Sequence, residues 1–465
     1  MLTGFIAGTV FGVAPAATES PASSIPVTVA EANHTADPYV IWIDADFSVA
    51  APAAHAIEAG VRTALHSSGN TLAGHPVIVM PVDHHGNARR SQRNLQRAAA
   101  DPRTIAVIGG IHSPPLLANQ ALINAEQLLL LNPWAAAGPI TRPEGDDNWI
   151  YRLSIDDALA GPFLVQEAIQ RHGEKLVLLA EETGWGRSNE RSMGDAFTAA
   201  TGQSLDVFTF SWDIGQLEAQ VLIDRVIASE PDAIIYVGNV SDAGPLFGHI
   251  ARQPVDSRPA IVSHWGITSG RLHDAADADE LDALDLTFLQ TRWRYAPENP
   301  ACAFEAAWAI AREHVLETPV VHPQDLGPPT GFVHAYDITK LLLAAAEQSA
   351  VDQTPSGRGQ TDRPHVRNAL QNLHRPVKGI LKTYDRPFRP WSLDQSASPD
   401  RCGHEALSKA DYTLGRFDVQ QRIVIDGTPR NTTTDQRSIP GQPAPASPAT
   451  ATATANANTP ADPRR

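Results

Sequence analysis

The chain has 465 residues and a formal net charge of −16, because 52 Asp and Glu outnumber 36 Lys and Arg. This acidic balance argues against a nucleic-acid-binding protein, since neutralising phosphates requires a basic surface. Hydrophobic residues make up 42% of the sequence, which is enough for large cores and excludes disorder over most of the length. Single cores stop growing at about 250–300 residues, so we expect two domains.

The two ends of the chain differ in composition from the rest. Residues 1–17 are apolar and close on Ala14-Pro15-Ala16. This pattern is typical of the hydrophobic region and cleavage site of a secretory signal, although no positive charge precedes it; the alternatives are a start further upstream and the beginning of a buried helix. We interpret residues 1–37 as a signal-like segment and linker, and residues 428–465, rich in Pro, Ala and Thr, as a disordered tail.

Between the ends, short apolar runs alternate with amphipathic stretches of helical length. The predicted strands are Val40–Ile43, Val77–Val82, Ile105–Ile108, Leu128–Leu131, Leu176–Ala180, Val207–Phe210, Ala233–Val237 and Ala260–Val262. The predicted helices, with apolar residues three and four apart, are His55–His66, Arg89–Ala100, Leu116–Glu126, Pro162–Arg171, Asn189–Ala200, Leu217–Ser229 and Ala243–Arg252. This alternation predicts an α/β protein whose parallel sheets are flanked by helices.

The loops that follow the strands are the expected place for a ligand, because open α/β sheets bind ligands at the carboxyl ends of their strands. Four of the nine tryptophans, Trp134, Trp185, Trp212 and Trp265, lie in or beside these loops. Rigid aromatic walls with a few polar groups are typical of ligand clefts. We expect two of the four to line a cleft and two to close the ends of the core.

Several short motifs follow in a fixed order along residues 39–427. They occupy residues 43–48, 108–113, 132–136, 151–157, 185–187, 231–233 and 336–337. Their order resembles that of type I periplasmic binding proteins of the branched-chain amino acid receptor group, the solute receptors of ABC importers. The resemblance implies two lobes joined by three crossings, with a solute captured between them. Lobe 1 is expected at 39–153 plus 269–366, and lobe 2 at 154–265 plus 367–427.

The resemblance also implies a set of ligand-binding residues. Ser113 stands at the family's hydroxyl that binds a ligand carboxylate, just before a helix expected to start near Pro114, whose first N–H groups favour an anion. The alternative is that Ser113 only caps that helix. Ala135 and Ala136 match positions that contribute a backbone group and a hydroxyl, and the hydroxyl is absent here.

On lobe 2, Trp185 matches the aromatic residue that stacks on the ligand. Asn239 matches a strand end that presents a side chain to it, or is a turn residue, since Asn tolerates the backbone conformation of turns. Trp134 and Trp265 would supply further aromatic walls.

The loop at residues 263–266 departs from the family pattern. Receptors of this group place an acid there for the ligand ammonium, and this loop has none. A buried ammonium without a counter-charge is costly. Asp44 and Asp46 in the first loop are candidate partners, with a capping or hinge role as the alternative. The sequence therefore favours a flat aromatic or larger apolar carboxylate over leucine or valine.

Signatures of catalysis are missing from the sequence. Asp83-His84-His85 lacks the spacing of zinc-binding helices, and no dinucleotide, P-loop or nucleophile-elbow motif occurs. We therefore expect neither an enzyme, nor a metal, nor a cofactor. The two cysteines, Cys302 and Cys402, would either form one disulfide in an oxidising compartment or remain buried thiols.

Together these observations predict an exported, periplasmic and monomeric receptor. It would bind a small carboxylate-bearing molecule, with an aromatic or apolar body favoured, and deliver it to the membrane permease of an ABC importer. No nucleic acid is expected among its partners. The alternative is a ligand-sensing regulator of the same fold that acts on a signalling partner.

Overall fold

The computed structural model describes residues 36–145, 147–275, 277–299, 301–392, 402–418 and 420–425. The apolar segment at 1–17 and the tail at 428–465 lie outside the described residues. Among the helices of the described residues, none is long and apolar enough to cross a membrane.

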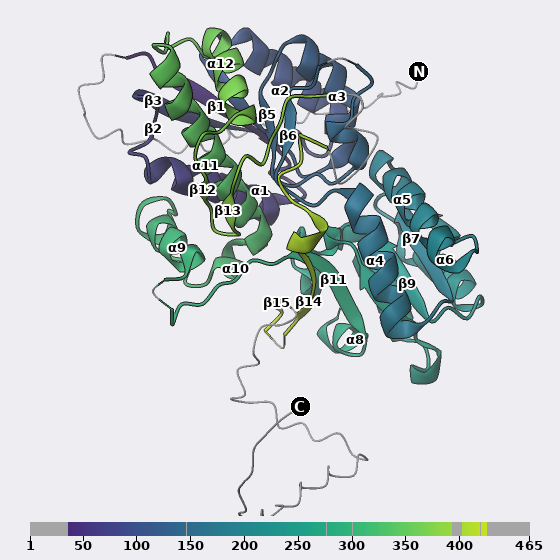
Figure 1. Cartoon of the computed structure of the whole chain (residues 1–465). Helices are drawn as coiled ribbons and strands as arrows, with labels where there is room; N and C mark the ends of the chain where they lie inside the picture. The colour runs from purple at the N-terminus through teal and green to yellow at the C-terminus, as the bar shows by residue number, and fades with distance from the viewer. Residues whose placement is uncertain are drawn as a thin grey trace, which may run out of the picture. The chain divides into compact units, whose positions relative to one another are not determined.

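The first sheet has six strands in the order β2-β3-β1-β4-β5-β6 (Figure 1). All its pairings are parallel except that of β2 with β3. β1 and β4 are buried along their whole length, as expected of strands covered on both faces. The bounds are β1 Tyr39–Ala45, β2 Thr71–Leu72, β3 His75–Asp83, β4 Thr104–Gly109, β5 Leu130–Asn132 and β6 Ile150–Arg152.

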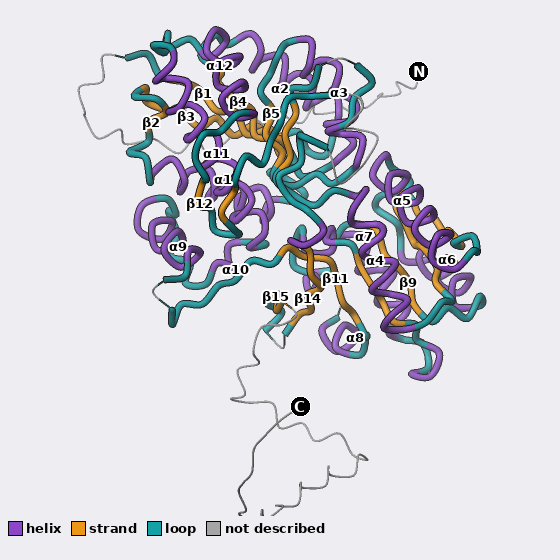
Figure 2. The backbone as a smooth tube through the Cα atoms, in the orientation of Figure 1, coloured by secondary structure: helices purple, strands orange, loops and turns teal. Residues whose placement is uncertain are grey.

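The second sheet has seven strands in the order β15-β14-β11-β10-β9-β7-β8. The five strands from β11 to β8 pair in parallel, and β14 and β15 extend the sheet in the antiparallel direction. The bounds are β7 Leu176–Glu181, β8 Asp206–Phe210, β9 Ala233–Val237, β10 Ala260–Ser263, β11 Leu286–Thr291, β14 Tyr412–Phe417 and β15 Ile423–Ile425. Figure 2 shows both sheets enclosed by helices.

The helices group around the two sheets. On lobe 1, α1 packs on α11, α11 packs on α12, and α2 packs on α3; on lobe 2, α4 packs on α5 and α6 on α7. The bounds are α1 Ala51–His66, α2 Ala88–Ala100, α3 Ser113–Ala125, α4 Asp157–His172, α5 Gly184–Thr201, α6 Gln216–Ile227, α7 Val240–Ala251, α8 Ala278–Asp282, α9 Ala303–His314, α10 Pro323–Leu326, α11 Pro329–Asp352 and α12 Gly359–Gln371. A short hairpin, β12 (Val377–Lys378) with β13 (Thr383–Tyr384), contacts α11.

The α/β fold with two lobes is the one predicted from the sequence, and every predicted strand and helix overlaps an observed element. The expected lobe boundaries need correction at two places. β11 pairs in parallel with β10, so residues 286–291 belong to the second sheet although they fall within 269–366. α12 contacts β4 and α11, so lobe 1 continues past residue 366 to the end of this helix.

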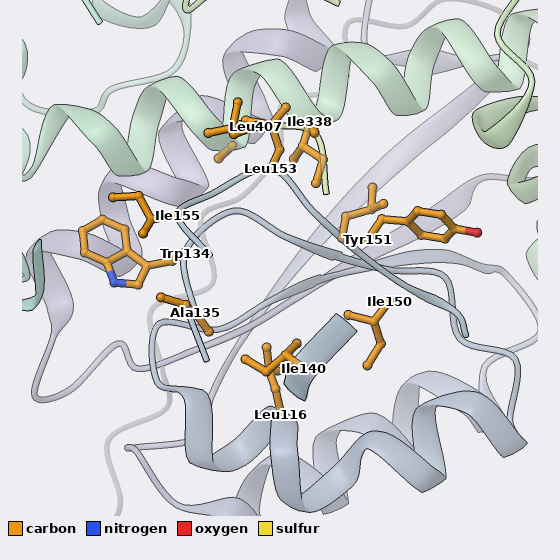
Figure 3. Close-up of a cluster of buried hydrophobic side chains, with 14 of the residues drawn as sticks. Leu116, Trp134, Ala135, Ile140, Ile150, Tyr151, Leu153, Ile155, Ile338 and Leu407 are labelled. Atoms are coloured by element: carbon orange, nitrogen blue, oxygen red, sulfur yellow. The ribbon is translucent and has the colours of Figure 1, made fainter. Parts of the chain in front are cut away.

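An apolar cluster ties two connections between the lobes to lobe 1: the first crossing, residues 153–156 between β6 and α4, and the third crossing, residues 402–411 before β14. Figure 3 shows it, with Leu153 and Ile155 of the first crossing near Trp134, Ile338 of α11 and Leu407 of the third crossing. All of these side chains are buried. The cluster therefore anchors both crossings in the core.

A buried charge network lies at the same place. Arg152 at the end of β6 binds Glu405 of the third crossing through two hydrogen bonds, Nε to Oε2 at 2.8 Å and Nη2 to Oε1 at 2.7 Å. Arg152 Nη2 also lies 2.8 Å from Asp156 Oδ1. The other Asp156 oxygen is 2.5 Å from Nη2 of Arg142. Burial alone would raise the pKa of Asp156. The guanidinium groups of Arg152 and Arg142 outweigh burial and hold this pKa below its ordinary value.

Candidate functional site

Loops from the strand ends of the two sheets meet between the lobes. The ring of Trp134, after β5, stacks on that of Trp265, after β10, with centroids 4.6 Å apart and planes 20° from parallel. The backbone N–H of Gly138 on lobe 1 donates to Ser188 Oγ on lobe 2 at 3.1 Å. We call Ser113, Trp134, Asp157, Trp185, His264 and Trp265 the interlobe cluster; all six are buried.

Ser113 is the first residue of α3, one position earlier than expected, and His112 occupies the N-cap. The Ser113 hydroxyl oxygen accepts a hydrogen bond from the Ala137 N–H at 3.2 Å. Because the oxygen is the acceptor of this bond, the hydroxyl proton can be donated to an anion. The capping alternative is therefore wrong, and the carboxylate role stays a prediction.

Ala135 and Ala136 hold the loop after β5 in place. The Ala135 carbonyl accepts from Asn132 Nδ2 at 2.7 Å and from Arg152 Nη1 at 3.2 Å. The Ala136 carbonyl accepts from the Asp157 N–H at 2.9 Å. Both carbonyls are thus engaged within the chain, so ligand contacts to them have no support from this geometry, and contacts to the two backbone N–H groups stay a prediction.

Asp157, at the start of α4, forms hydrogen bonds with two aromatic side chains of lobe 2, Trp185 and His264. Its Oδ1 accepts from Trp185 Nε1 at 3.2 Å and lies 3.1 Å from His264 Nε2. His264 Nδ1 accepts from the Trp265 N–H at 2.9 Å, which places the imidazole proton on Nε2 as the donor to Asp157. Oδ2 of Asp157 is buried and has no hydrogen-bond partner among the described residues.

This arrangement corrects the reading of the loop at 263–266. The loop itself carries no acid, but Asp157 lies against its His264 at hydrogen-bond distance. Asp157 is not among the residues predicted for ligand binding, because it stands 107 residues before His264, at the start of α4. Its position directly after Asp156 in the motif at 151–157 was the one available signal.

Trp134 and Trp265 fill the space between the loops that carry them. They are 2% and 1% exposed, and Trp265 also lies 5.7 Å from the ring of His334 on α11. Trp212, the fourth strand-end tryptophan, lies edge-on to His112 of lobe 1 with centroids 5.0 Å apart. These tryptophans therefore contribute to the contact between the lobes.

Asp46 has its two carboxylate oxygens engaged within lobe 1. Oδ2 lies 2.9 Å from His112 Nε2, and Oδ1 accepts from the N–H groups of Val49 and Ser48. Burial alone would raise the pKa of Asp46, but these hydrogen bonds outweigh burial and hold the pKa well below its ordinary value. Asp44 similarly accepts from Ser91 and Asn94. Both carboxylates are therefore engaged within lobe 1 and neither caps a helix, so an ammonium-binding role has no support from this geometry.

Asn239 is the N-cap residue of α7, and its side chain is directed to a carboxylate of lobe 2. Its Nδ2 donates to Glu181 Oε2 at 3.0 Å, and Thr183 Oγ1 donates to Oε1 at 2.6 Å. Glu181 ends β7, is 3% exposed, and was not singled out from the sequence. Burial, with a contribution from Asp242, raises the pKa of Glu181 from 4.5 to about 7.

The titration of Glu181 is expected to make the protein lose stability as the pH rises. In the unfolded chain this carboxyl releases its proton near its ordinary pKa, so the folded state binds more protons between about pH 4.5 and 7. The stabilisation is full below about pH 4.5 and is lost as the pH rises through about 7, by about 1.4 kcal/mol per pKa unit at most.

Glu181→Gln, which is neutral at every pH, should flatten this decline. The measurement is the free energy of unfolding in urea at about pH 5 and about pH 8. The matched control is Glu182→Gln, since Glu182 is the exposed neighbour and should leave the decline unchanged. A Glu181→Gln protein that declines as steeply as the unmodified chain would contradict the prediction.

The two cysteines are free thiols in the structure. Cys302 Sγ lies 3.4 Å from the Arg294 carbonyl oxygen, and Cys402 Sγ lies 3.9 Å from that of Thr141. The structure therefore agrees with the thiol alternative rather than with a disulfide. The described residues contain no group of three or more His, Cys, Asp or Glu side chains arranged to hold a metal ion.

A groove of about 1140 Å³ runs along α4 and α5 of lobe 2 and is also lined by Gly138, Pro139, Arg142 and Glu144 of lobe 1. Its lining includes Val165 and Ile169 of α4 and Ala196 and Ala199 of α5. No residue predicted for ligand binding lines it. The candidate site is therefore the interlobe cluster, where the predicted residues converge.

Comparison with solved structures shows the same fold. The chain is similar to a type 1 periplasmic binding protein from Bordetella pertussis Tohama I, with 15% identity, a TM-score of 0.66, and coverage of 84% of this chain and 100% of that one. It is similar to the leucine-binding protein LivK from Thermotoga maritima MSB8, with 14% identity, a TM-score of 0.63, and coverage of 83% and 97%. It is also similar to an ABC-transporter solute-binding protein from R. palustris in complex with benzoate, with 16% identity, a TM-score of 0.64, and coverage of 84% and 96%.

At these identities the solved structures establish the fold and leave the ligand open. No curated protein matches the chain. The family model described as periplasmic binding protein matches residues 40–391, which is most of the sequence. The chain therefore belongs to the periplasmic binding protein family.

Proposed function

We propose that the chain is an extracytoplasmic solute-binding receptor of an ABC importer. It captures a small carboxylate-bearing ligand between its two lobes and delivers it to a membrane permease. The observation that carries this proposal is the convergence of Ser113 and Trp134 of lobe 1 with Trp185 and Trp265 of lobe 2. Similar structures are solute-binding proteins, and we propose that this chain likewise binds its ligand without altering it.

The carboxylate is favoured by the chemistry around Ser113. Its hydroxyl proton lies in the first turn of α3, where the helix dipole attracts negative charge, although Pro114 and Pro115 carry no N–H and so remove two donors. Leucine and benzoate, named for two of the similar structures, both carry a carboxylate. Leucine offers an aliphatic side chain and benzoate a flat ring, and the tryptophans of the interlobe cluster suit either.

Capture requires that the ligand prefers the closed arrangement of the lobes. A ligand with equal affinity for open and closed states would shift nothing, however tightly it bound. Contacts from Ser113 on one lobe and Trp185 on the other supply this preference, because a ligand can touch both only when the lobes are together. The chain then acts as a periplasmic monomer that presents its closed form to the permease.

The test is a thermal-shift screen of the full chain against leucine, benzoate, 4-hydroxybenzoate and short aliphatic carboxylates. Each is paired with its amide, which keeps the shape and lacks the carboxylate. A bound carboxylate should raise the melting temperature, with about 2.7 kcal/mol of stabilisation at a hundredfold excess over its dissociation constant. Equal shifts from the amides, or no shift from any carboxylate, would overturn the proposal.

A further inference from the structure

One oxygen of Asp157 is a buried hydrogen-bond acceptor without a donor. The residue is fully buried, and Oδ2 has no partner among the described residues. An unsatisfied buried acceptor is costly, and a carboxylate oxygen more so than a neutral one. In a binding protein, a hydrogen-bond donor of the ligand can satisfy such an oxygen.

The other oxygen of Asp157 fixes the orientation of the carboxylate. Oδ1 takes both donors of lobe 2, Trp185 Nε1 at 3.2 Å and His264 Nε2 at 3.1 Å. The ring of Trp185 stands edge-on to that of His264, with centroids 5.0 Å apart and planes at 87°. Two rigid rings therefore hold one oxygen, and the second oxygen remains as the free acceptor.

The free acceptor and the Ser113 hydroxyl are anchored to the same loop. The Asp157 N–H donates to the Ala136 carbonyl at 2.9 Å, and the next residue, Ala137, donates its N–H to Ser113 Oγ at 3.2 Å. Consecutive Cα atoms are about 3.8 Å apart. The loop at 136–137 thus links the backbone of Asp157 on one side to the hydroxyl of Ser113 on the other.

We infer that Asp157 is a specificity-determining residue whose Oδ2 accepts a hydrogen bond from an N–H or O–H group of the ligand. The inference rests on the proposed function and narrows its ligand to a carboxylate that also carries a donor. An ammonium is the strongest such donor, because a charge-assisted hydrogen bond to a carboxylate is about twice as strong as a neutral one. Asp157 then supplies the acidic group for the ligand that the loop at 263–266 lacks.

The experiment compares ligand pairs that differ by the donor alone. They are leucine with 4-methylpentanoate, and 4-hydroxybenzoate with benzoate, each titrated calorimetrically into the full chain. In at least one pair the donor-bearing member should bind at least about tenfold more tightly, because its analogue leaves Oδ2 unsatisfied. Discrimination in the leucine pair identifies an ammonium as the donor, and discrimination in the hydroxybenzoate pair identifies a hydroxyl.

The decisive variant is Asp157→Asn. Asparagine keeps an oxygen for Trp185 and His264 and places an N–H₂ donor at the position of Oδ2, where it opposes the donor of the ligand. The donor-bearing member should weaken by at least about tenfold, and its analogue by much less. The matched control is Asp195→Asn, an exposed residue on α5, which should leave both affinities unchanged.

The outcomes separate this inference from the proposed function. If carboxylates bind but Asp157→Asn keeps the affinities of both members of the discriminating pair, the inference is overturned and the receptor role stands. If the variant weakens both members equally and lowers the melting temperature of the free protein, Asp157 is a positioning residue and the inference is again overturned. If no carboxylate binds the unmodified chain, both fail.

Discussion

Replacing Glu405 with alanine is expected to lower the free energy of unfolding by about 3–5 kcal/mol. The substitution removes the carboxylate that binds Arg152 through two hydrogen bonds of 2.7 and 2.8 Å. Arg152 is 0% exposed, so its guanidinium would remain in the core with less compensation for its charge. Breaking a buried pair on one side costs far more than the pair itself contributes, because an unpaired charge is left behind.

Urea unfolding monitored by circular dichroism measures this loss. The matched control is Glu280→Ala, which removes a carboxylate from the solvent-accessible pair of Glu280 with Arg252 and should cost less than about 1 kcal/mol. A further variant, Glu405→Gln, keeps the shape of the side chain and should fall between the two. A loss for Glu405→Ala no larger than that of the control would show that the buried network does not stabilise the fold.

Replacing Trp185 with alanine is expected to weaken binding of the tightest carboxylate from the screen by at least about tenfold, or about 1.4 kcal/mol. The ring is 6% exposed, and its Nε1 donates to Asp157 while its edge meets His264. Its loss removes a rigid aromatic wall and frees the carboxylate of Asp157 to rotate. Isothermal titration calorimetry gives the affinity, and the melting temperature of the free protein shows whether folding is intact.

Two companion variants resolve the contributions of this site. Trp185→Phe keeps an aromatic ring without Nε1, so its affinity should lie between those of the unmodified protein and Trp185→Ala. Ser113→Ala removes the hydroxyl expected at the ligand carboxylate and should also weaken binding. If neither Ser113→Ala nor Trp185→Ala changes the affinity, the assignment of the interlobe cluster as the ligand site is wrong.

The elements of the fold could be predicted because their signals are local. Apolar runs and helical spacing marked every strand and helix named from the sequence. The lobe membership of β11 could not be predicted in this way. β11 is not among the strands predicted from the sequence, which end at Val262, and only its parallel pairing with β10 assigns it to the second sheet. Pairing between strands is a property of the whole fold and leaves little trace in one segment.

The same distinction between local and distant signals applies to the residues of the candidate site. Ser113 and Trp185 were singled out by the resemblance to the family, and both lie in strand-end loops, where this fold class binds ligands; their ligand roles stay predictions. The role of Asp157 could not, since its donors Trp185 and His264 stand 28 and 107 residues away. Asp46 is the reverse case. The sequence suggested it as a ligand partner, but in the structure it forms a hydrogen bond with His112, which lies 66 residues further along the chain. Side chains with distant partners need the structure.

Because the Arg152–Glu405 pair is buried, dissolved salt should affect the junction between the first and third crossings only weakly. The backbone of Arg152 forms a parallel bridge with that of Glu405, so the first and third crossings are joined through both backbone and charge. Dissolved ions weaken attraction between exposed charges over about 8–10 Å but reach buried pairs poorly. In the extracytoplasmic receptor that we propose, this junction between the lobes would therefore keep its strength in fresh and in briny media alike.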